Sequence, residues 1–144
     1  MNRAYLITFI LLLGSFCSRG QNMTLKNESE VMALTKKVAH FFTKDSIPAI
    51  FKALELYWPI SKADLDEMES KTVSLMATIR EQYGEPFGNV KVREEKIGGI
   101  GFRETYFVQY TKSAVRLKIS YYKNTTGWIV HSFTWDDSFA EEFR

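Results

Sequence analysis

The sequence predicts an α+β fold in which three N-terminal helices pack on one face of a four-stranded antiparallel meander sheet. Up to Gly84 the apolar residues recur every three or four positions, which is the spacing of a helix face. After Pro86 they recur every second position, as in a strand. The loops between successive strands are short, so neighbouring strands must run antiparallel. Because each helix has one apolar stripe, all three stripes can be buried only against one face of the sheet.

Each of the three predicted helices has a recognisable start or end. The first begins near residue 28, and its apolar stripe is formed by Val31, Leu34, Val38, Phe41 and Phe42. Asp45 and Ser46 suit the N-cap of the second helix, with Pro48 in its first turn, where a missing N–H costs nothing. Ser61 begins the third helix as the first residue of a capping box, and Gly84 ends it as a C′ glycine.

Four strands are predicted in the second half of the chain. The first contains Val90 and Val92 and is followed by a glycine-rich turn at residues 98–101. The other three strands cover residues 102–110, 115–122 and 128–135. The third has the clearest alternation of apolar and polar residues. A short segment, 138–143, follows the last strand and is expected to pack back on the domain.

The first 20 residues have the pattern of a signal peptide. A basic residue is followed by an apolar run that is too short to span a bilayer, and then by small and polar residues. We expect cleavage between Gly20 and Gln21, a flexible lead-in over 21–27 and a single α+β domain over 28–144. Cys17 leaves an alternative in which the chain is processed as a lipoprotein and anchored through that cysteine. Either way, the prediction is export, with no transmembrane segment in the mature chain.

Removal of residues 1–20 changes the net charge and the cysteine content of the chain. It takes away two basic residues and the only cysteine, so 17 basic residues balance 17 acidic ones. We therefore expect no nucleic-acid binding, no disulfides and no thiol chemistry. The histidines His40 and His131 have no metal-ligand spacing around them, so we expect neither a metal site nor a cofactor. Asn22, Asn27 and Asn124 stand in Asn-x-Ser/Thr triplets, which accept glycans in a eukaryotic secretory pathway.

The closing run over residues 121–137 is rich in aromatic and turn residues, among them Tyr121, Tyr122, Gly127 and Trp128. With the order of elements, it resembles small exported bacterial proteins of unknown function that have a cystatin-like or nuclear-transport-factor-2-like α+β fold. The resemblance covers most of residues 28–137. Better-known members of that superfamily carry a strand pair between their helices, which this sequence lacks. The resemblance implies a fold, and no catalytic residue carries over.

The fourth predicted strand supplies the candidate binding residues. His131 shares parity with Phe133 and Trp135, so these three side chains and Tyr106 are expected to face the space between sheet and helices. An aromatic-lined pocket there suits an apolar or ring-bearing small molecule. The first hypothesis is therefore an exported, non-enzymatic binding or accessory module. The alternative is an acid/base enzyme in which His131 works with Glu104, but no nucleophile or fixed partner is recognisable, so no catalytic residue is assigned.

A third hypothesis is an interaction protein that uses the opposite face of the sheet. Arg116, Lys118 and Tyr122 alternate with the buried residues of the third strand, so they are expected on the outer face. Basic side chains around an aromatic ring suit an anionic surface or partner. Asp136 and Asp137 point to opposite faces of a strand, so we expect them to end the fourth strand rather than to share a proton.

Overall fold

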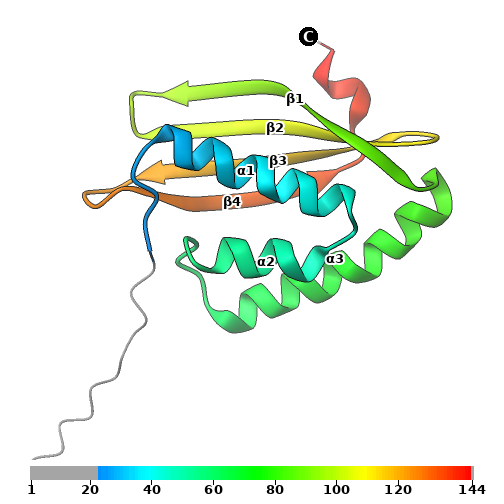
Figure 1. The fold of residues 1–144 in the computed structure, drawn as a ribbon, viewed down its shortest axis with the longest axis horizontal. Helices are drawn as coiled ribbons and strands as arrows, with labels where there is room; N and C mark the ends of the chain where they lie inside the picture. Colours follow the sequence, from blue (N-terminus) through cyan, green and yellow to red (C-terminus); the bar gives the residue numbers. More distant parts are fainter. Residues whose placement is uncertain (1–22, 144) are drawn as a thin grey trace, which may run out of the picture.

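The computed structural model describes residues 23–143 as an α+β protein in which the helices precede the strands (Figure 1). The helices are α1 (Glu28–Thr43), α2 (Ile47–Glu55) and α3 (Lys62–Tyr83). The strands are β1 (Pro86–Ile97), β2 (Gly101–Tyr110), β3 (Ala114–Lys123) and β4 (Trp128–Asp136), followed by the 3-10 helix η1 (Phe139–Glu142). The predicted α+β class, with three helices followed by a four-stranded antiparallel meander, is confirmed. The third helix, α3, packs mainly on α2 rather than on the face of the sheet. The signal peptide, its cleavage site at Gly20–Gln21, Cys17 and Asn22 lie outside the described residues.

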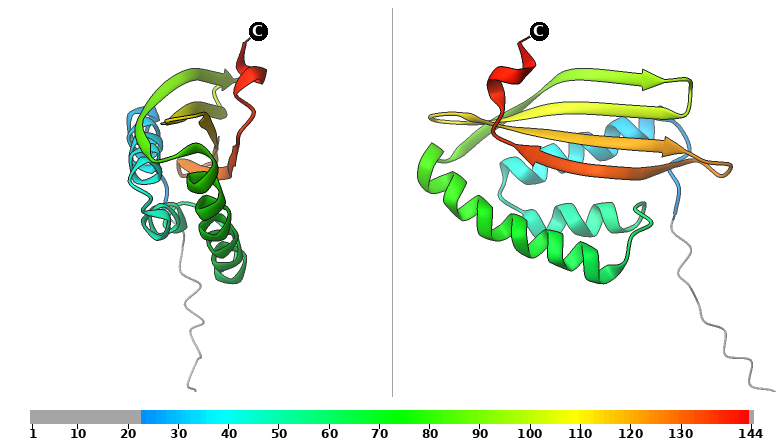
Figure 2. Two further views of the ribbon diagram at one scale, coloured as in Figure 1. Left: turned by 90° about the vertical axis from the view of Figure 1, so that its right-hand side faces the viewer. Right: turned by 180° about the vertical axis from the view of Figure 1, so that it is seen from behind.

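The strands form one antiparallel sheet in the order β1-β2-β3-β4, so each strand pairs with its neighbours in sequence. Helices α1 and α2 lie against one face, called here the inner face (Figure 2). The C-terminal segment crosses the opposite, outer face, where η1 contacts β2 and β3. Within residues 23–143, none of the helices combines the length and apolar content needed to cross a membrane. The chain has a single cysteine, so it forms no internal disulfide.

Local side-chain contacts explain where the helices begin and end. Asn27 caps α1, its side chain accepting a hydrogen bond from the Glu30 N–H at 2.9 Å. Ser61 caps α3 as predicted and accepts from the Asp64 N–H at 3.1 Å. Ser46 occupies the N-cap position of α2, but its side chain makes no capping hydrogen bond. These caps satisfy main-chain donors that the first helical turn leaves unpaired.

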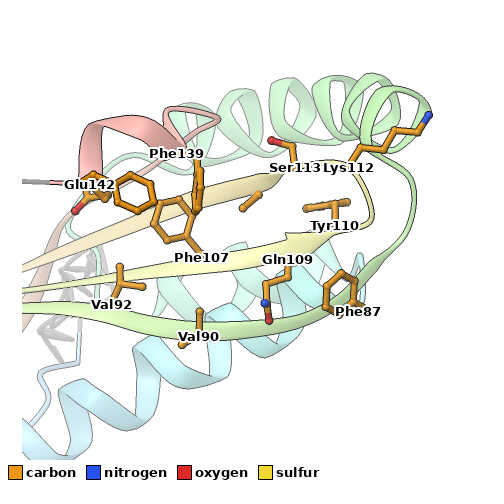
Figure 3. Close-up of a pocket in the computed structure, with 12 residues that line it drawn as sticks. Phe87, Val90, Val92, Phe107, Gln109, Tyr110, Lys112, Ser113, Phe139 and Glu142 are labelled. Atoms are coloured by element: carbon orange, nitrogen blue, oxygen red, sulfur yellow. The ribbon is translucent and has the colours of Figure 1, made fainter.

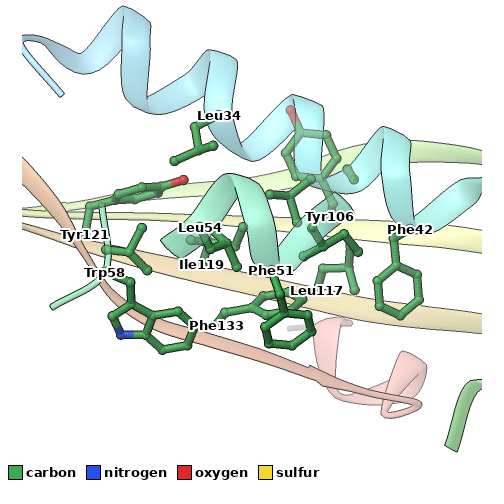
Figure 4. Close-up of a cluster of buried hydrophobic side chains, with 14 of the residues drawn as sticks. Leu34, Phe42, Phe51, Leu54, Trp58, Tyr106, Leu117, Ile119, Tyr121 and Phe133 are labelled. Carbon is green, nitrogen blue, oxygen red and sulfur yellow. The ribbon is translucent and has the colours of Figure 1, made fainter. Parts of the chain in front are cut away.

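The core lies between the inner face of the sheet and the two helices on it (Figure 4). Phe42 and Ile119 are almost completely buried, and the ring of Phe51 from α2 packs against that of Phe133 from β4 with centroids 6.0 Å apart. Every second residue of β2 and β3, from Phe102 to Tyr110 and from Val115 to Tyr121, is buried on the inner face, as the strand spacing predicts. Several outer-face residues between them are buried as well. The long α3 contributes less to this core, since only Leu65, Thr72 and Met76 are buried.

The N-terminal residues cover the beginning of β4. Leu25, which is 4 % exposed, pairs with Trp128 through main-chain hydrogen bonds of 2.8 Å in both directions. The N–H of Val130 donates to the carbonyl of Tyr57 at 2.9 Å. The prediction of a flexible lead-in over 21–27 did not anticipate this pairing. The first half of this sheet edge is therefore occupied by the chain itself.

Candidate functional site

Of the four residues predicted to line an aromatic pocket, only Phe133 and Trp135 line a common concave surface, which lies between β4 and α3. Tyr106 is 7 % exposed and buried beneath α1, and Phe133 is packed against Phe51 in the core. Trp135 lies at the edge of the sheet, where it meets α3. His131 is exposed, on the outer face. The space between the sheet and helices α1 and α2 is filled by side chains (Figure 4).

A β-bulge accounts for the position of His131. The pairing of β3 with β4 shifts by one residue between Val130 and Ser132, which leaves His131 as the extra residue. The side chain of His131 therefore lies with Arg103 and Tyr122 around a depression of about 660 Å³ on the outer face. The prediction that His131 faces the helices is wrong, because it assumed an unbroken alternation along the strand.

Glu104, the predicted partner of His131, lies on the inner face with no exposed surface. Its Oε1 is 2.7 Å from the Nζ of Lys91, and its Oε2 has no hydrogen-bond partner among the described residues. Burial alone would lower the pKa of Lys91, but hydrogen bonds to Glu104 and Glu94 outweigh it and raise the pKa above its ordinary value. Because Glu104 and His131 are on opposite faces of the sheet, they cannot exchange a proton directly.

Arg116 lies on the outer face, as its parity predicted, but it is only 5 % exposed. Its Nε and Nη2 donate to the two carboxylate oxygens of Asp136 at 3.0 and 2.8 Å. The same guanidinium donates to Glu141 at 3.0 Å and to Glu142 at 2.8 Å, both on η1. The prediction of Arg116 as a free surface residue is therefore corrected: its charge holds the C-terminal segment on the sheet.

The electrostatics of this cluster follow from the same contacts. Burial alone would raise the pKa of the Asp136 carboxyl, but hydrogen bonds from Arg116 and Ser138 lower it below its ordinary value. Burial opposes ionisation of Glu142 as well, yet Arg116, Arg93 and Lys118 bring its pKa below the ordinary range. Both carboxylates are thus held in the charged form.

Lys118 and Tyr122, the other two residues predicted on the outer face, differ in exposure and in ion pairing. The Lys118 ammonium lies 3.6 Å from Glu142, and its side chain is 30 % exposed. Tyr122 is 45 % exposed and lies near His131 around the same depression. Asp136 is the last residue of β4 and accepts a hydrogen bond from the Ser138 N–H, as expected of residues that end the strand. A basic patch formed by Arg116 and Lys118 is not presented to solvent.

The outer face carries a different concave site, which we call the outer-face hollow (Figure 3). It measures about 520 Å³ and lies between β1, β2 and the C-terminal segment. Its apolar lining comes mainly from Phe87, Val90, Val92, Phe107, Phe139 and Phe143. Polar residues at its rim include Gln109, Lys112 and Glu142. Lys112 forms no ion pair with any residue in the described part of the chain.

Aromatic packing builds the hollow from segments far apart in sequence. The ring of Phe139 packs edge-on against Phe107 of β2, with centroids 5.2 Å apart, and Phe143 packs on Phe139 at the same distance. Phe107 is 4 % exposed, so η1 covers it. Phe87 and Phe143 remain 67 % and 74 % exposed, which is unusual for phenylalanine. Solvent therefore reaches large apolar side chains on two sides of this hollow.

Sequence reasoning missed the outer-face hollow, although one signal for it was present. Phe107 stands at a position of β2 whose parity assigns it to the outer face, beside Tyr106 and Val108 of the inner face. When a strand has one buried face, a large apolar residue at a position facing the other side indicates that another segment covers that side. The covering residues, Phe139 and Phe143, were correctly expected to pack back on the domain.

Comparison with family models, with curated proteins and with solved structures finds no match to this chain. Between residues 23 and 143, no group of three or more His, Cys, Asp or Glu side chains is placed to hold a metal ion. The site combines an apolar hollow with polar and charged lining residues of both signs.

Proposed function

We propose that this protein is an exported, non-enzymatic binding module that holds an apolar ligand in the outer-face hollow. The observation that carries the proposal is the exposure of Phe87 and Phe143 beside a concave apolar surface. Its volume of about 520 Å³ falls in the usual range of small-molecule sites. A hollow of this kind suits a ring system or a short acyl chain, because burial of apolar surface drives such binding.

The rim favours a ligand with a negatively charged end. Glu142 is held by Arg116 and Arg93, so its charge is already compensated. Lys112 has no such partner among residues 23–143. Its long side chain extends away from the phenylalanine rings in Figure 3 and can turn to pair with a carboxylate or sulfonate of the ligand. The expected ligand is therefore an apolar molecule with one anionic group, with its apolar part among the phenylalanine rings.

Titration with the fluorescent probe 1-anilinonaphthalene-8-sulfonate tests this proposal, because the probe has both features. We expect saturable binding that is weakened at least about tenfold when Phe87→Ser and Phe143→Ser are combined. Lys112→Gln should weaken binding less, and more at low salt than at high salt. Ile97→Ser is the matched control, since Ile97 is 72 % exposed at the other end of β1. Equal effects of the control and the double variant would reject the hollow as the site.

Export rests on the signal-peptide pattern of residues 1–20, and the order of helices and strands supports the cystatin-like resemblance. Mass spectrometry of the mature N-terminus distinguishes the two processing routes. A chain that starts at Gln21 supports signal-peptide cleavage, and a lipid-modified Cys17 at the N-terminus supports a membrane-anchored module. An uncleaved N-terminus in the native host would contradict export by either route.

A further inference from the structure

A second concave surface lies between the far half of β4 and helix α3, and we call it the β4–α3 groove. Its volume is about 510 Å³. One wall is α3, through Met68, Thr72, Leu75 and Ile79, and the other is β4 with the residue that follows it, through Phe133, Trp135 and Asp137. Trp135 joins the walls at one point, where its Nε1 donates to Thr72 Oγ1 at 3.3 Å. The groove shares no lining residue with the outer-face hollow.

In an antiparallel sheet, alternate residues of a strand form hydrogen bonds with the neighbour on one side and with the neighbour on the other. This alternation shows which main-chain groups of β4 point into the groove. The N–H of Tyr110 donates to Ser113 and that of Lys123 donates to Ile100, so the odd-numbered residues of β3 bond to β2. The even-numbered residues of β3 must then bond to β4, and they pair with Thr134 and Asp136.

Phe133 and Trp135 alternate with those bonded residues of β4, so their N–H and C=O groups point away from the sheet. Neither residue has a main-chain hydrogen bond on that side to any described residue. The result is a short run of unpaired donors and acceptors along one wall of an apolar groove. An extended polypeptide satisfies such groups by adding a strand.

The other half of the same edge shows how such pairing works in this protein. Leu25 forms a bridge with Trp128, and the carbonyl of Tyr57 accepts from Val130. These contacts end before Phe133. The chain thus pairs its own segments with the first half of β4 and leaves the second half open.

Side chains of the groove define the chemistry of the segment that fits it. Leu75 is 53 % exposed on the α3 wall, near Met68 and Ile79. Asp137, at the end of the groove, accepts a hydrogen bond from the Tyr83 hydroxyl at 2.8 Å and has no cation partner among the described residues. Complementary side chains are an apolar residue facing α3 and a lysine or arginine facing Asp137.

We propose that the β4–α3 groove binds an extended segment of a partner protein, which pairs with Phe133 and Trp135 as a fifth strand. An apolar side chain of the segment packs against Leu75, and a basic side chain pairs with Asp137. The main chain supplies affinity and the two side chains supply selectivity, as in other cases of strand addition.

Panning of a phage-displayed random peptide library against the full chain tests this proposal. The enriched sequences should combine alternating apolar residues with a lysine or arginine. A fluorescently labelled copy of the best one is then titrated by anisotropy. Leu75→Arg should weaken its binding at least about tenfold, whereas Val73→Arg should leave it unchanged. Val73 is the matched control because it is 47 % exposed on the same helix and lies outside the groove. Asp137→Asn should weaken binding mainly at low salt.

N-methylation of the peptide distinguishes strand addition from simple apolar contact. Methyl groups on one set of alternate amides should abolish binding, and methyl groups on the other set should leave it intact, because only one set faces β4. Failure to enrich any peptide, equal effects of Leu75→Arg and Val73→Arg, or equal effects of the two methylated sets would each overturn the proposal. So would self-association of the chain that Leu75→Arg removes, because the occupant would then be a second copy.

Discussion

Arg116→Ala should destabilise the protein by about 2–3 kcal/mol, and the burial of each partner sets that magnitude. The substitution removes four hydrogen bonds to Asp136, Glu141 and Glu142. Removing one partner from a fully buried ion pair costs about 3–5 kcal/mol, because a charge is left uncompensated. Here the cost is smaller, since the Asp136 side chain is 38 % exposed and Glu142 keeps its contact with Arg93 at 2.8 Å.

Urea unfolding followed by tryptophan fluorescence measures this loss. With a slope of about 1.5 kcal/mol per molar urea, the midpoint should fall by roughly 1.3–2 M. Arg103→Ala is the matched control, because Arg103 holds Glu95 through two hydrogen bonds of 2.7 and 2.9 Å but is 45 % exposed. Its cost should stay below about 1 kcal/mol. If the two alanine variants unfold at the same urea concentration, burial does not set the strength of these ion pairs.

The same cluster predicts how stability depends on pH. The pKa values of Asp136 and Glu142 are lowered in the folded protein from ordinary values of 3.8 and 4.5. Groups with a lowered folded pKa contribute stability above their unfolded pKa and lose it as pH falls through the folded value. The free energy of unfolding should therefore decrease from about pH 5 to about pH 3, and Arg116→Ala should reduce that decrease. An equal pH slope in wild type and variant would contradict the assignment.

Two further predictions concern the core and the turn before β4. Lys91→Ala leaves the buried charge of Glu104 unpaired, so it should lower the free energy of unfolding in urea by about 3 kcal/mol. Lys91→Met combined with Glu104→Leu removes both charges and should come within about 1 kcal/mol of wild type. A double variant no more stable than the single one would contradict this explanation. Gly127→Ala should cost at least about 2 kcal/mol, because φ is +154° and a Cβ would meet the Leu25 carbonyl oxygen at 2.5 Å. Gly98→Ala is its control, with φ of +50° and open space around the added Cβ, and equal losses of melting temperature in the two alanine variants would show that the clash is not the cause.

Local patterns were sufficient to predict the helices and the order of the strands. Helical spacing, the Ser61 cap and the Gly84 stop depend on residues within a few positions of one another, so the sequence displays them directly. The first strand was predicted from Val90 and Val92 alone, whereas β1 covers Pro86–Ile97. The register of its pairing with β2 shifts between Pro86 and Gly88 and again between Lys91 and Arg93. Such shifts break the alternation of apolar and polar residues from which strands are recognised.

The candidate site could not be predicted because it depends on contacts between distant segments. The bulge at His131 has no local sequence signal, and one extra residue was enough to move this side chain to the other face. Arg116 was expected to be free because its acidic partners follow it by 20 to 26 positions and reach it only when the chain folds back. Periodicity assigns a residue to a face, and it does not reveal what later covers that face.

The Arg116 cluster and the outer-face hollow are physically linked, which gives one further test of the proposed function. Glu141 and Glu142 fix η1 to the sheet through Arg116, and η1 carries Phe139, which forms a wall of the hollow. Without Arg116, η1 must become ordered when the ligand binds, and the conformational entropy lost in that step reduces the affinity. Arg116→Ala should therefore weaken binding of the anilinonaphthalene probe several-fold under conditions where the variant is still folded, whereas Arg103→Ala should not. Unchanged probe affinity in a folded Arg116→Ala protein would show that the ligand does not use the η1 wall.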